Sequence, residues 1–261
     1  MTIRSPRRLA LALATLSLAI PGIAGAAGDV FADGFESGSL SSWTRAVGAV
    51  AVQSSAVRSG SFAARTTPAG SQAFIARSFG ASRAELYAQT WFRVLSRSTP
   101  ASLLRFVRSD KPLLGVGLQS DGRVFLRNAT VATTQVADRA VTDSAWHELE
   151  VHIRVGDAGR SDVWLDGREL AELGGAQSLG AEGVSVLRLG EDVRNRTSDI
   201  AYDDVEVSTA FIEPADHDAP TTPTGLVAEA LGSRRVHLSW TPATDDTLQK
   251  SFCYIVCSCL T

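Results

Sequence analysis

The sequence predicts an all-β fold in which two antiparallel sheets pack face to face as a sandwich. Between residues 50 and 207, apolar and polar residues alternate in short runs, which is the side-chain period of a strand. No run of ten or more residues in this region keeps a helical period. Gly, Asp, Ser and Pro interrupt the runs, as turns between strands do. Half-buried strands of a two-sheet sandwich have this pattern.

Two strands show the alternation most clearly. Residues 86–94 place Leu86, Ala88, Thr90, Phe92 and Val94 on one face, and Tyr87, Gln89, Trp91 and Arg93 on the other. Residues 146–155 place His147, Leu149, Val151, Ile153 and Val155 on one face, and Trp146, Glu148, Glu150, His152 and Arg154 on the other. We predict that the first set of each strand is buried and that the second set faces outward.

Two hairpins are predicted from their turns. Residues 113–119 and 123–127 flank Ser120-Asp121-Gly122, where Gly supplies the positive φ of a tight turn. Residues 163–165 and 168–170 flank Asp166-Gly167, a pair favoured in two-residue type I′ turns.

Two segments at the ends of this region each join a strand to carboxylates. They are residues 33–43 and residues 200–207. We expect the first and last strands to lie side by side and to close one domain.

The first 26 residues have the pattern of a signal peptide. Arg4, Arg7 and Arg8 precede an apolar run from Leu9 to Ile20, and small residues end the segment at Ala26. The run is shorter than the roughly 20 residues that span a bilayer. We therefore predict a secreted protein, extracellular or at the cell surface, with no membrane association after cleavage. The formal net charge of −3 and the absence of Lys and Arg clusters argue against nucleic-acid binding.

The C-terminal part changes composition. Residues 1–252 contain no cysteine, so a disulfide framework cannot hold the main domain together. Residues 213–224 have the Pro-rich composition of a linker. Residues 225–247 resemble the first strands of a fibronectin type III domain, which needs about 100 residues when complete. Residues 248–261 contain all three cysteines, and we interpret them as an aberrant tail from a frameshift or truncation.

The central region resembles a known family. Ala145-Trp146-His147-Glu148-Leu149-Glu150-Val151, followed by Val163-Trp164-Leu165-Asp166-Gly167, is similar to a hairpin that recurs in laminin-G-like domains. With the two terminal segments, residues 29–212 resemble the laminin-G-like, or concanavalin A-like, jelly roll of secreted bacterial proteins. The resemblance implies a binding or adhesive module in most cases.

The same jelly-roll class includes glycoside hydrolases and polysaccharide lyases, so the sequence must be tested for catalytic residues. Glu148 and Glu150 lie on one face, but the E-x-D-x-x-E pattern of laminarinase-like hydrolases is missing. We interpret both as solvent-exposed charges and His147 as a core histidine. No lyase base set and no G-x-S-x-G elbow is present. On these grounds the chain is predicted not to be an enzyme, with no catalytic residue.

The resemblance also implies one structural Ca²⁺. In similar jelly rolls the ion lies between the first strand, a Gly turn and an Asp of the last strand. The matching positions are Glu36, the carbonyl of Gly60, and Asp203. Oxygen ligands of this kind suit Ca²⁺. The alternative is that Glu36 and Asp203 hydrogen-bond to turns or face water.

For ligand binding, Tyr87 and Trp91 are the candidates because they share the outward face of one strand, where sugar rings could stack. The sequence therefore predicts a monomeric, secreted, non-catalytic binding or adhesion module for an extracellular polysaccharide or glycan, part of a larger multidomain protein. One alternative is a polysaccharide-degrading glycoside hydrolase or lyase of jelly-roll fold, or a fragment of one. Another is a structural spacer.

Overall fold

The computed structural model describes residues 28–212, 221–232 and 235–242. The predicted signal peptide, most of the linker and the aberrant tail lie outside these residues. The elements of the main domain are β1 (Asp29–Asp33), β2 (Arg45–Val47), β3 (Val50–Gln53), β4 (Ala63–Thr66), β5 (Ala73–Arg83), β6 (Glu85–Arg97), β7 (Ala101–Arg108), β8 (Lys111–Leu118), β9 (Arg123–Asn128), β10 (Thr133–Ala140), β11 (Trp146–Arg154), β12 (Arg160–Leu165), β13 (Arg168–Glu169), the 3-10 helix η1 (Ala171–Leu173), β14 (Gly175–Ala176), β15 (Val184–Glu191) and β16 (Ser198–Ser208).

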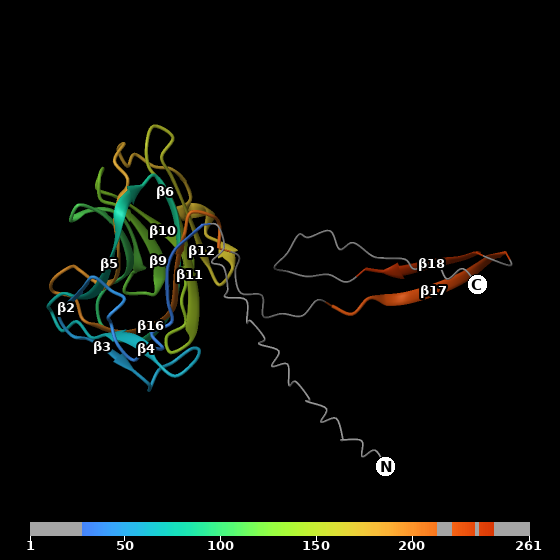
Figure 1. The fold of residues 1–261 in the computed structure, drawn as a ribbon, viewed down its shortest axis with the longest axis horizontal. Helices are drawn as coiled ribbons and strands as arrows, with labels where there is room; N and C mark the ends of the chain where they lie inside the picture. The colour runs from blue at the N-terminus through green and yellow to red at the C-terminus, as the bar shows by residue number, and fades with distance from the viewer. Residues whose placement is uncertain (1–27, 213–220, 233–234, 243–261) are drawn as a thin grey trace, which may run out of the picture.

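Within the described residues, these strands form two antiparallel sheets that pack as a sandwich (Figure 1). Sheet A has nine strands, in the order β13-β12-β11-β6-β16-β4-β3, with β1 beside β16 and β14 beside β12. Sheet B has seven strands, in the order β10-β9-β8-β7-β15-β5-β2. The prediction of an all-β jelly-roll sandwich is confirmed.

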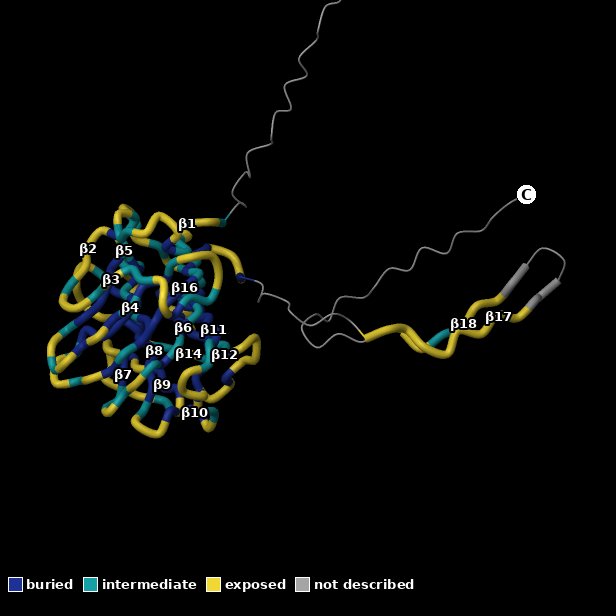
Figure 2. Tube along the Cα trace, turned by 90° about the horizontal axis from the view of Figure 1, so that it is seen from below, coloured by how far each residue is buried: buried dark blue, intermediate teal, exposed yellow. Residues whose placement is uncertain are grey.

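The core lies between the two sheets, where Figure 2 shows the buried residues. Strand β6 contributes Leu86, Ala88, Phe92 and Val94, and β11 contributes Leu149, Val151 and Ile153, all buried in one cluster. The inward faces predicted for these two strands are therefore correct. The two strands are hydrogen-bonded neighbours, so their apolar residues form one continuous surface against sheet B.

The first and last strands of the sandwich close it as predicted. β1 pairs antiparallel with β16, with Asp33 opposite Val205. Both predicted hairpins are also present, as β8 with β9 and as β12 with β13. Asp166 and Gly167 have φ values of 53° and 71°, the left-handed pair that a type I′ turn requires.

His147 links the turn at Asp166 to the core. Its Nδ1 lies 3.0 Å from Asp166 Oδ2, and Thr142 N donates to its Nε2 at 3.0 Å. The hydrogen bond to Asp166 raises the pKa of His147. The imidazole is buried and touches Phe92, so the interpretation of His147 as a core histidine is correct.

A separate hairpin follows the sandwich. Its strands are β17 (Thr224–Gly232) and β18 (Arg235–Thr241), which pair antiparallel. Leu226 and Leu238 are exposed on it. Its kinship with a fibronectin type III domain stays a prediction. Among the described residues, no helix is long and apolar enough to cross a membrane.

Candidate functional site

A row of arginines crosses the outer face of sheet B. Residues opposite one another on neighbouring strands point to the same face of a sheet, so a row can be followed from strand to strand. Arg188 and Arg105 are outward because their neighbours Leu187, Leu189, Leu104 and Phe106 lie in the core. From β2 to β10, the residues in register are Arg45, Ala76, Arg188, Arg105, Gly115, Arg127 and Thr134.

Two carboxylates hold the central arginines of this row in place. Asp192 Oδ1 lies 2.7 Å from Arg105 Nη1, and Asp192 Oδ2 lies 3.4 Å from Arg188 Nη1. The Asp192 side chain is 3% exposed, so it fixes the guanidinium groups from below. Asp110, which is exposed, pairs with Arg188 Nη2 at 3.0 Å. Side chains fixed in this way lose little further entropy when a ligand binds.

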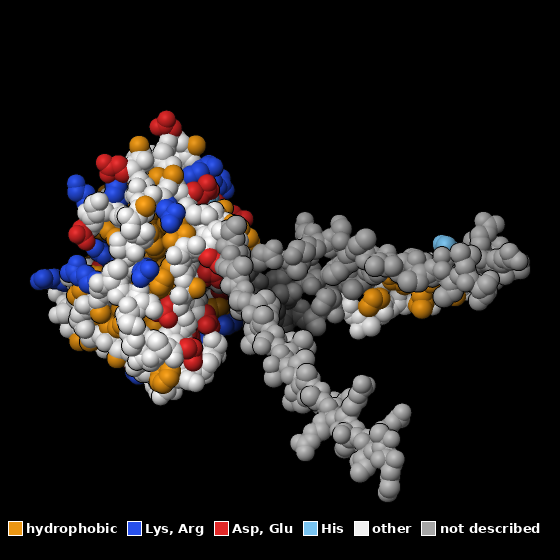
Figure 3. Space-filling view, in the orientation of Figure 1, with side chains coloured by type: hydrophobic (Ala, Val, Ile, Leu, Met, Phe, Trp, Pro, Cys, Tyr) orange, Lys and Arg blue, Asp and Glu red, His pale blue; other side chains and the backbone are white. Residues whose placement is uncertain are grey.

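The outer arginines, Arg45 and Arg127, are exposed, whereas the side chain of the central Arg188 is 11% exposed. Arg45 and Arg188 both lie over the ring of Phe74, with Cζ at 5.8 and 5.1 Å from its centroid. Arg127 donates to a backbone carbonyl and to Thr134 Oγ1. Within the described residues, neither Arg45 nor Arg127 belongs to an ion pair. Figure 3 shows basic side chains reaching outward beside the edge where β5 and β2 lie in Figure 1.

Two glycines make room for this surface in the middle of sheet B. An added Cβ at Gly115 would meet Arg105 Nε at 2.9 Å, and one at Gly117 would meet the Phe125 ring at 2.6 Å. The side chains of Arg105 and Phe125 therefore lie flat over β8. A residue larger than glycine at position 115 or 117 would displace them.

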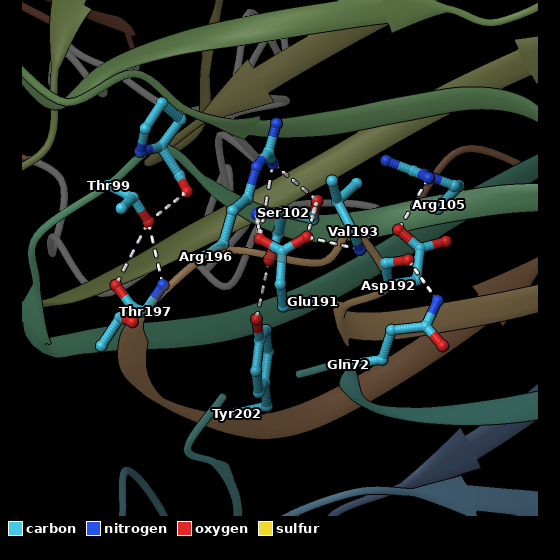
Figure 4. A network of polar contacts seen from close by, with 11 residues as sticks. Gln72, Thr99, Ser102, Arg105, Glu191, Asp192, Val193, Arg196, Thr197 and Tyr202 are labelled. Carbon is cyan, nitrogen blue, oxygen red and sulfur yellow. Dashed lines mark hydrogen bonds and ion pairs between the residues drawn. The ribbon is translucent and has the colours of Figure 1, made fainter. Parts of the chain in front are cut away.

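A buried network supports the same end of β15 from inside (Figure 4). Glu191 is 1% exposed and accepts hydrogen bonds from Ser102 N at 2.8 Å, Ser102 Oγ at 2.9 Å and Val193 N at 2.8 Å. Arg196 Nη1 lies 3.4 Å from its Oε2. Because Asp192 is the next residue, the Glu191 network also fixes the backbone that carries the partner of Arg105.

The predicted ligand residues Tyr87 and Trp91 lie on the opposite surface, the outer face of sheet A. His152 stacks on the Tyr87 ring with centroids 4.4 Å apart, and Phe211 meets it edge-on at 5.9 Å. The guanidinium of Arg58 lies 3.7 Å from the centroid of Trp91. Both rings are half-buried under these partners. A role for them in ligand binding stays a prediction.

The interpretation of Glu148 and Glu150 as solvent-exposed charges is wrong. They are 4% and 1% exposed. Gln89 Nε2 donates to Glu148 Oε1 at 2.6 Å, and Ile212 N donates to Glu150 Oε1 at 3.1 Å. Burial, with a smaller contribution from the Glu148 charge, raises the pKa of Glu150 to about 8. The sequence pattern indicates that both side chains point outward. It cannot show that Ile212, far along the chain, contacts Glu150.

The predicted calcium residues lie around one loop, residues 58–62. Asp203 Oδ2 accepts from Arg58 N at 2.9 Å and from Ser59 N at 3.3 Å. Glu36 accepts from Ser61 N and Phe62 N, both at 3.0 Å through Oε1. Gly60 lies against the Glu36 carboxylate. Burial raises the pKa of Asp203. In the described part of the chain, no cluster of three or more His, Cys, Asp or Glu is arranged to hold a metal.

We propose the structural calcium ion as a testable feature of this loop. The carboxylates of Glu36 and Asp203 and the carbonyl of Gly60 would supply part of the oxygen ligands of such an ion. At a calcium concentration about 100-fold above Kd, binding adds about 2.7 kcal/mol to the free energy of unfolding. Removing calcium with EDTA should then lower the midpoint of thermal unfolding by roughly 5–10 °C. Added Ca²⁺ should restore the midpoint, and Mg²⁺ at the same concentration should not. An unchanged midpoint would mean that the amide hydrogen bonds alone hold both carboxylates.

Sequence reasoning missed the arginine row. Arg105 and Arg188 each stand alone between apolar residues, as in Leu187-Arg188-Leu189, and Arg45 and Arg127 each have one apolar neighbour. Both patterns also fit an isolated surface charge. The available signal was that Arg45, Arg105, Arg127 and Arg188 all occupy outward positions of strands. Their common register depends on the strand order, which local patterns do not give.

No protein-family model matches the chain, and no curated protein matches it. Solved structures share its fold. One is endo-beta-1,4-glucuronan lyase from the fungus Trichoderma reesei, with 17% identity, a TM-score of 0.54, and coverage of 70% of this chain and 96% of that chain. Another is domain 4 of AbnA, an extracellular arabinanase from Geobacillus stearothermophilus, in complex with arabinotriose. It has 13% identity, a TM-score of 0.53, and coverage of 72% and 96%.

A third is the carbohydrate esterase vb_24B_21 from the Shiga toxin-encoding bacteriophage phi24B, with 15% identity, a TM-score of 0.50, and coverage of 70% of this chain and 99% of that chain. The prediction that the chain is not an enzyme is wrong, because its grounds do not hold. It excluded enzymes because the E-x-D-x-x-E pattern, a lyase base set and a G-x-S-x-G elbow were missing from the sequence. A lyase and an esterase are nevertheless built on this same fold, so the missing patterns do not set the chain apart from enzymes. At these identities, the similarity shows that the chain has the jelly-roll fold.

Proposed function

We propose that the sandwich recognises an acidic polysaccharide, a chain of uronate sugars, along the arginine row of sheet B. The observation that carries the proposal is the register of Arg45, Arg188, Arg105 and Arg127 on one face. The guanidinium group matches the carboxylate in geometry and charge and binds it through two parallel hydrogen bonds. The shared fold with a glucuronan lyase supports the same class of ligand.

The spacing of the row also suits a polymer. Neighbouring strands lie about 5 Å apart, so arginines two strands apart are separated by about 10 Å. In an extended β-1,4-linked pyranose chain alternate sugars are turned over, so carboxylates on one side recur at every second sugar, a repeat close to two strand spacings. The pairs Arg45–Arg188 and Arg105–Arg127 each have this separation, so either pair could meet two carboxylates on one side of a chain that runs across the strands.

The arginines of the row are packed against glycines and aromatic rings. Gly115 and Gly117 carry no side chain, and Phe125 lies over β8 beside them. Phe74 is 3% exposed and lies under the guanidinium groups of Arg45 and Arg188, so it supports these arginines from below. The ligand would therefore meet the guanidinium groups, which bind its carboxylates. We place export in the same proposal, on the basis of the signal-peptide pattern of residues 1–26.

A titration with paired oligosaccharides tests this function. We expect β-1,4-linked glucuronate oligomers to bind, and β-1,4-linked glucose oligomers of the same length to bind at least about tenfold more weakly, a difference of 1.4 kcal/mol. The two differ only in the carboxylate. Raising the salt concentration should weaken glucuronate binding, because exposed charges are screened. Equal affinity for the two oligomers would reject recognition of the carboxylate.

The same samples report on catalysis and on the alternative surface. Cleavage by elimination would appear as ultraviolet absorbance of unsaturated uronate products, and hydrolysis as new reducing ends. Variants Tyr87→Ala and Trp91→Ala should bind glucuronate as well as the unchanged protein does. Loss of binding in these two variants, with arginine variants unaffected, would transfer the site to the outer face of sheet A.

A further inference from the structure

A short segment after the last strand of the sandwich lies across the outer face of sheet A. We call this segment, residues 209–212, the clasp. Its start is tied to the beginning of the domain, since Thr209 N donates to Gly28 O at 2.8 Å. Phe211 meets the ring of Trp164 at 5.4 Å and that of Tyr87 at 5.9 Å, both edge-on. Ile212 is 7% exposed, and its N–H donates to Glu150 Oε1 at 3.1 Å.

The clasp covers a carboxyl group in unfavourable surroundings. Glu150 Oε2 is buried and has no hydrogen-bond partner among the described residues. Opposite Glu150 on the neighbouring strands are Gln89 and Trp164, which carry no charge. A buried carboxylate without a cation is costly, whereas the protonated acid is tolerated.

The other charged groups on this face do not neutralise an ionised Glu150. Glu148 and Glu206 both act on it by repulsion. The cationic form of His152 would be balanced by two carboxylates, since Nδ1 lies 2.9 Å from Asp162 Oδ2 and Nε2 lies 2.8 Å from Glu85 Oε1. The titratable and charged groups that face Glu150 or its neighbours are Glu148, His152 and Arg154 on β11, Tyr87 and Glu85 on β6, Asp162 and Arg160 on β12, and Glu206 on β16, with Asp29 of β1 acting on Glu206. Of the two cations, Arg160 pairs with Asp162 at 2.6 Å, and Arg154 donates to the carbonyl of Ala158.

We propose that residues 209–212 form a proton-dependent clasp: it lies on sheet A while the Glu150 carboxyl is protonated, and ionisation of Glu150 releases it. Release would uncover Trp164 and Tyr87. The proposal concerns sheet A alone and is independent of the arginine row.

The direction of the pH dependence follows from the two states. In the closed state burial raises the pKa of Glu150 to about 8. In the open state the group meets water and titrates near its ordinary value. The closed state therefore binds the proton more tightly and is favoured at low pH. Between the two values, each pH unit weakens closure by up to about tenfold, and above the closed-state pKa there is no further effect.

Hydrogen exchange at the Ile212 amide, followed by NMR and corrected for the intrinsic pH dependence of exchange, tests the clasp. We expect its protection to fall by up to about 100-fold between pH 6 and pH 8 in the unchanged protein. Glu150→Gln keeps an acceptor but cannot ionise, so its Ile212 protection should be the same at both pH values. Glu182→Gln is the matched control, because Glu182 is 79% exposed, and it should behave as the unchanged protein does.

A second variant covers the case in which Glu150→Gln fails to fold. Phe211→Ala removes the ring that packs on Trp164 and Tyr87, and should lower Ile212 protection at both pH values while keeping the fall between them. Equal protection at pH 6 and pH 8 in the unchanged protein would overturn the proposal. The same fall in Glu150→Gln as in the unchanged protein would also overturn it.

Discussion

Replacing Arg105 with alanine is expected to weaken binding of β-1,4-linked glucuronate oligomers by about 10- to 100-fold, or about 1.4–2.8 kcal/mol. Arg105 occupies the centre of the row, its side chain is 15% exposed, and its Nη1 lies 2.7 Å from Asp192 Oδ1. Its loss removes a bidentate partner for a carboxylate and leaves the charge of Asp192 closer to the ligand. Titration calorimetry at low salt measures the change.

Arg105→Lys separates charge from geometry. Lysine keeps a positive charge beside Asp192 but lacks the planar fork, so we expect an intermediate loss of about tenfold. Thermal unfolding of both variants must accompany the titration, because Asp192 is buried and loses a partner when Arg105 is shortened. Reduced binding in a variant with an unchanged unfolding midpoint assigns the effect to recognition.

A matched pair on β9 tests whether the row, rather than general positive charge, binds the ligand. Arg127 lies in the row, whereas Arg123 lies four residues earlier on the same strand and pairs with Asp121 at 2.8 Å. Both are exposed. Arg127→Ala should weaken glucuronate binding by several-fold, and Arg123→Ala should leave it within about twofold. Equal losses in the two variants would show that the ligand binds to general positive charge and not to the row.

The sandwich could be predicted because its signals are local. Alternation in residues 86–94 and 146–155 follows directly from the pleat of a strand, and the Asp166-Gly167 turn follows from the positive φ of both residues. The pairing of the first and last strands is not local. It could still be expected, because the terminal segments resemble those of a family in which these strands are neighbours.

The chemistry of the two outer faces could not be predicted, because each depends on contacts between distant segments. The arginine row requires that β15 lie between β5 and β7, which joins Arg188 to Arg105 across more than 80 residues of sequence. The burial of Glu150 requires the clasp, whose Ile212 lies 62 residues later. Alternation placed Glu150 on the outward face correctly, whereas the arginines of the row were not assigned from the sequence. It gave no information on what lies beside or above them.

Glu191→Gln is expected to be the most destabilising single substitution considered for the sandwich. Glu191 offers four acceptor contacts to Ser102, Val193 and Arg196 in a site that is 1% exposed. Glutamine has one carboxamide oxygen, and its NH₂ group would face N–H donors. Breaking a buried charge pair while leaving its partner in place costs about 3–5 kcal/mol. For a domain of this size, that corresponds to a fall of roughly 10 °C in the unfolding midpoint.

Two other substitutions should destabilise the domain much less than Glu191→Gln does. Ser102→Ala removes the hydroxyl but keeps the amide donor, so it should cost only about 1 kcal/mol. Glu182→Gln makes the same chemical change at a side chain that is 79% exposed and pairs with Arg108 at 3.3 Å, and it should shift the free energy of unfolding by less than about 0.5 kcal/mol. If Glu191→Gln unfolds at the same temperature as Glu182→Gln, the network does not stabilise the end of β15. The position of Asp192 beneath Arg105 would then need another support.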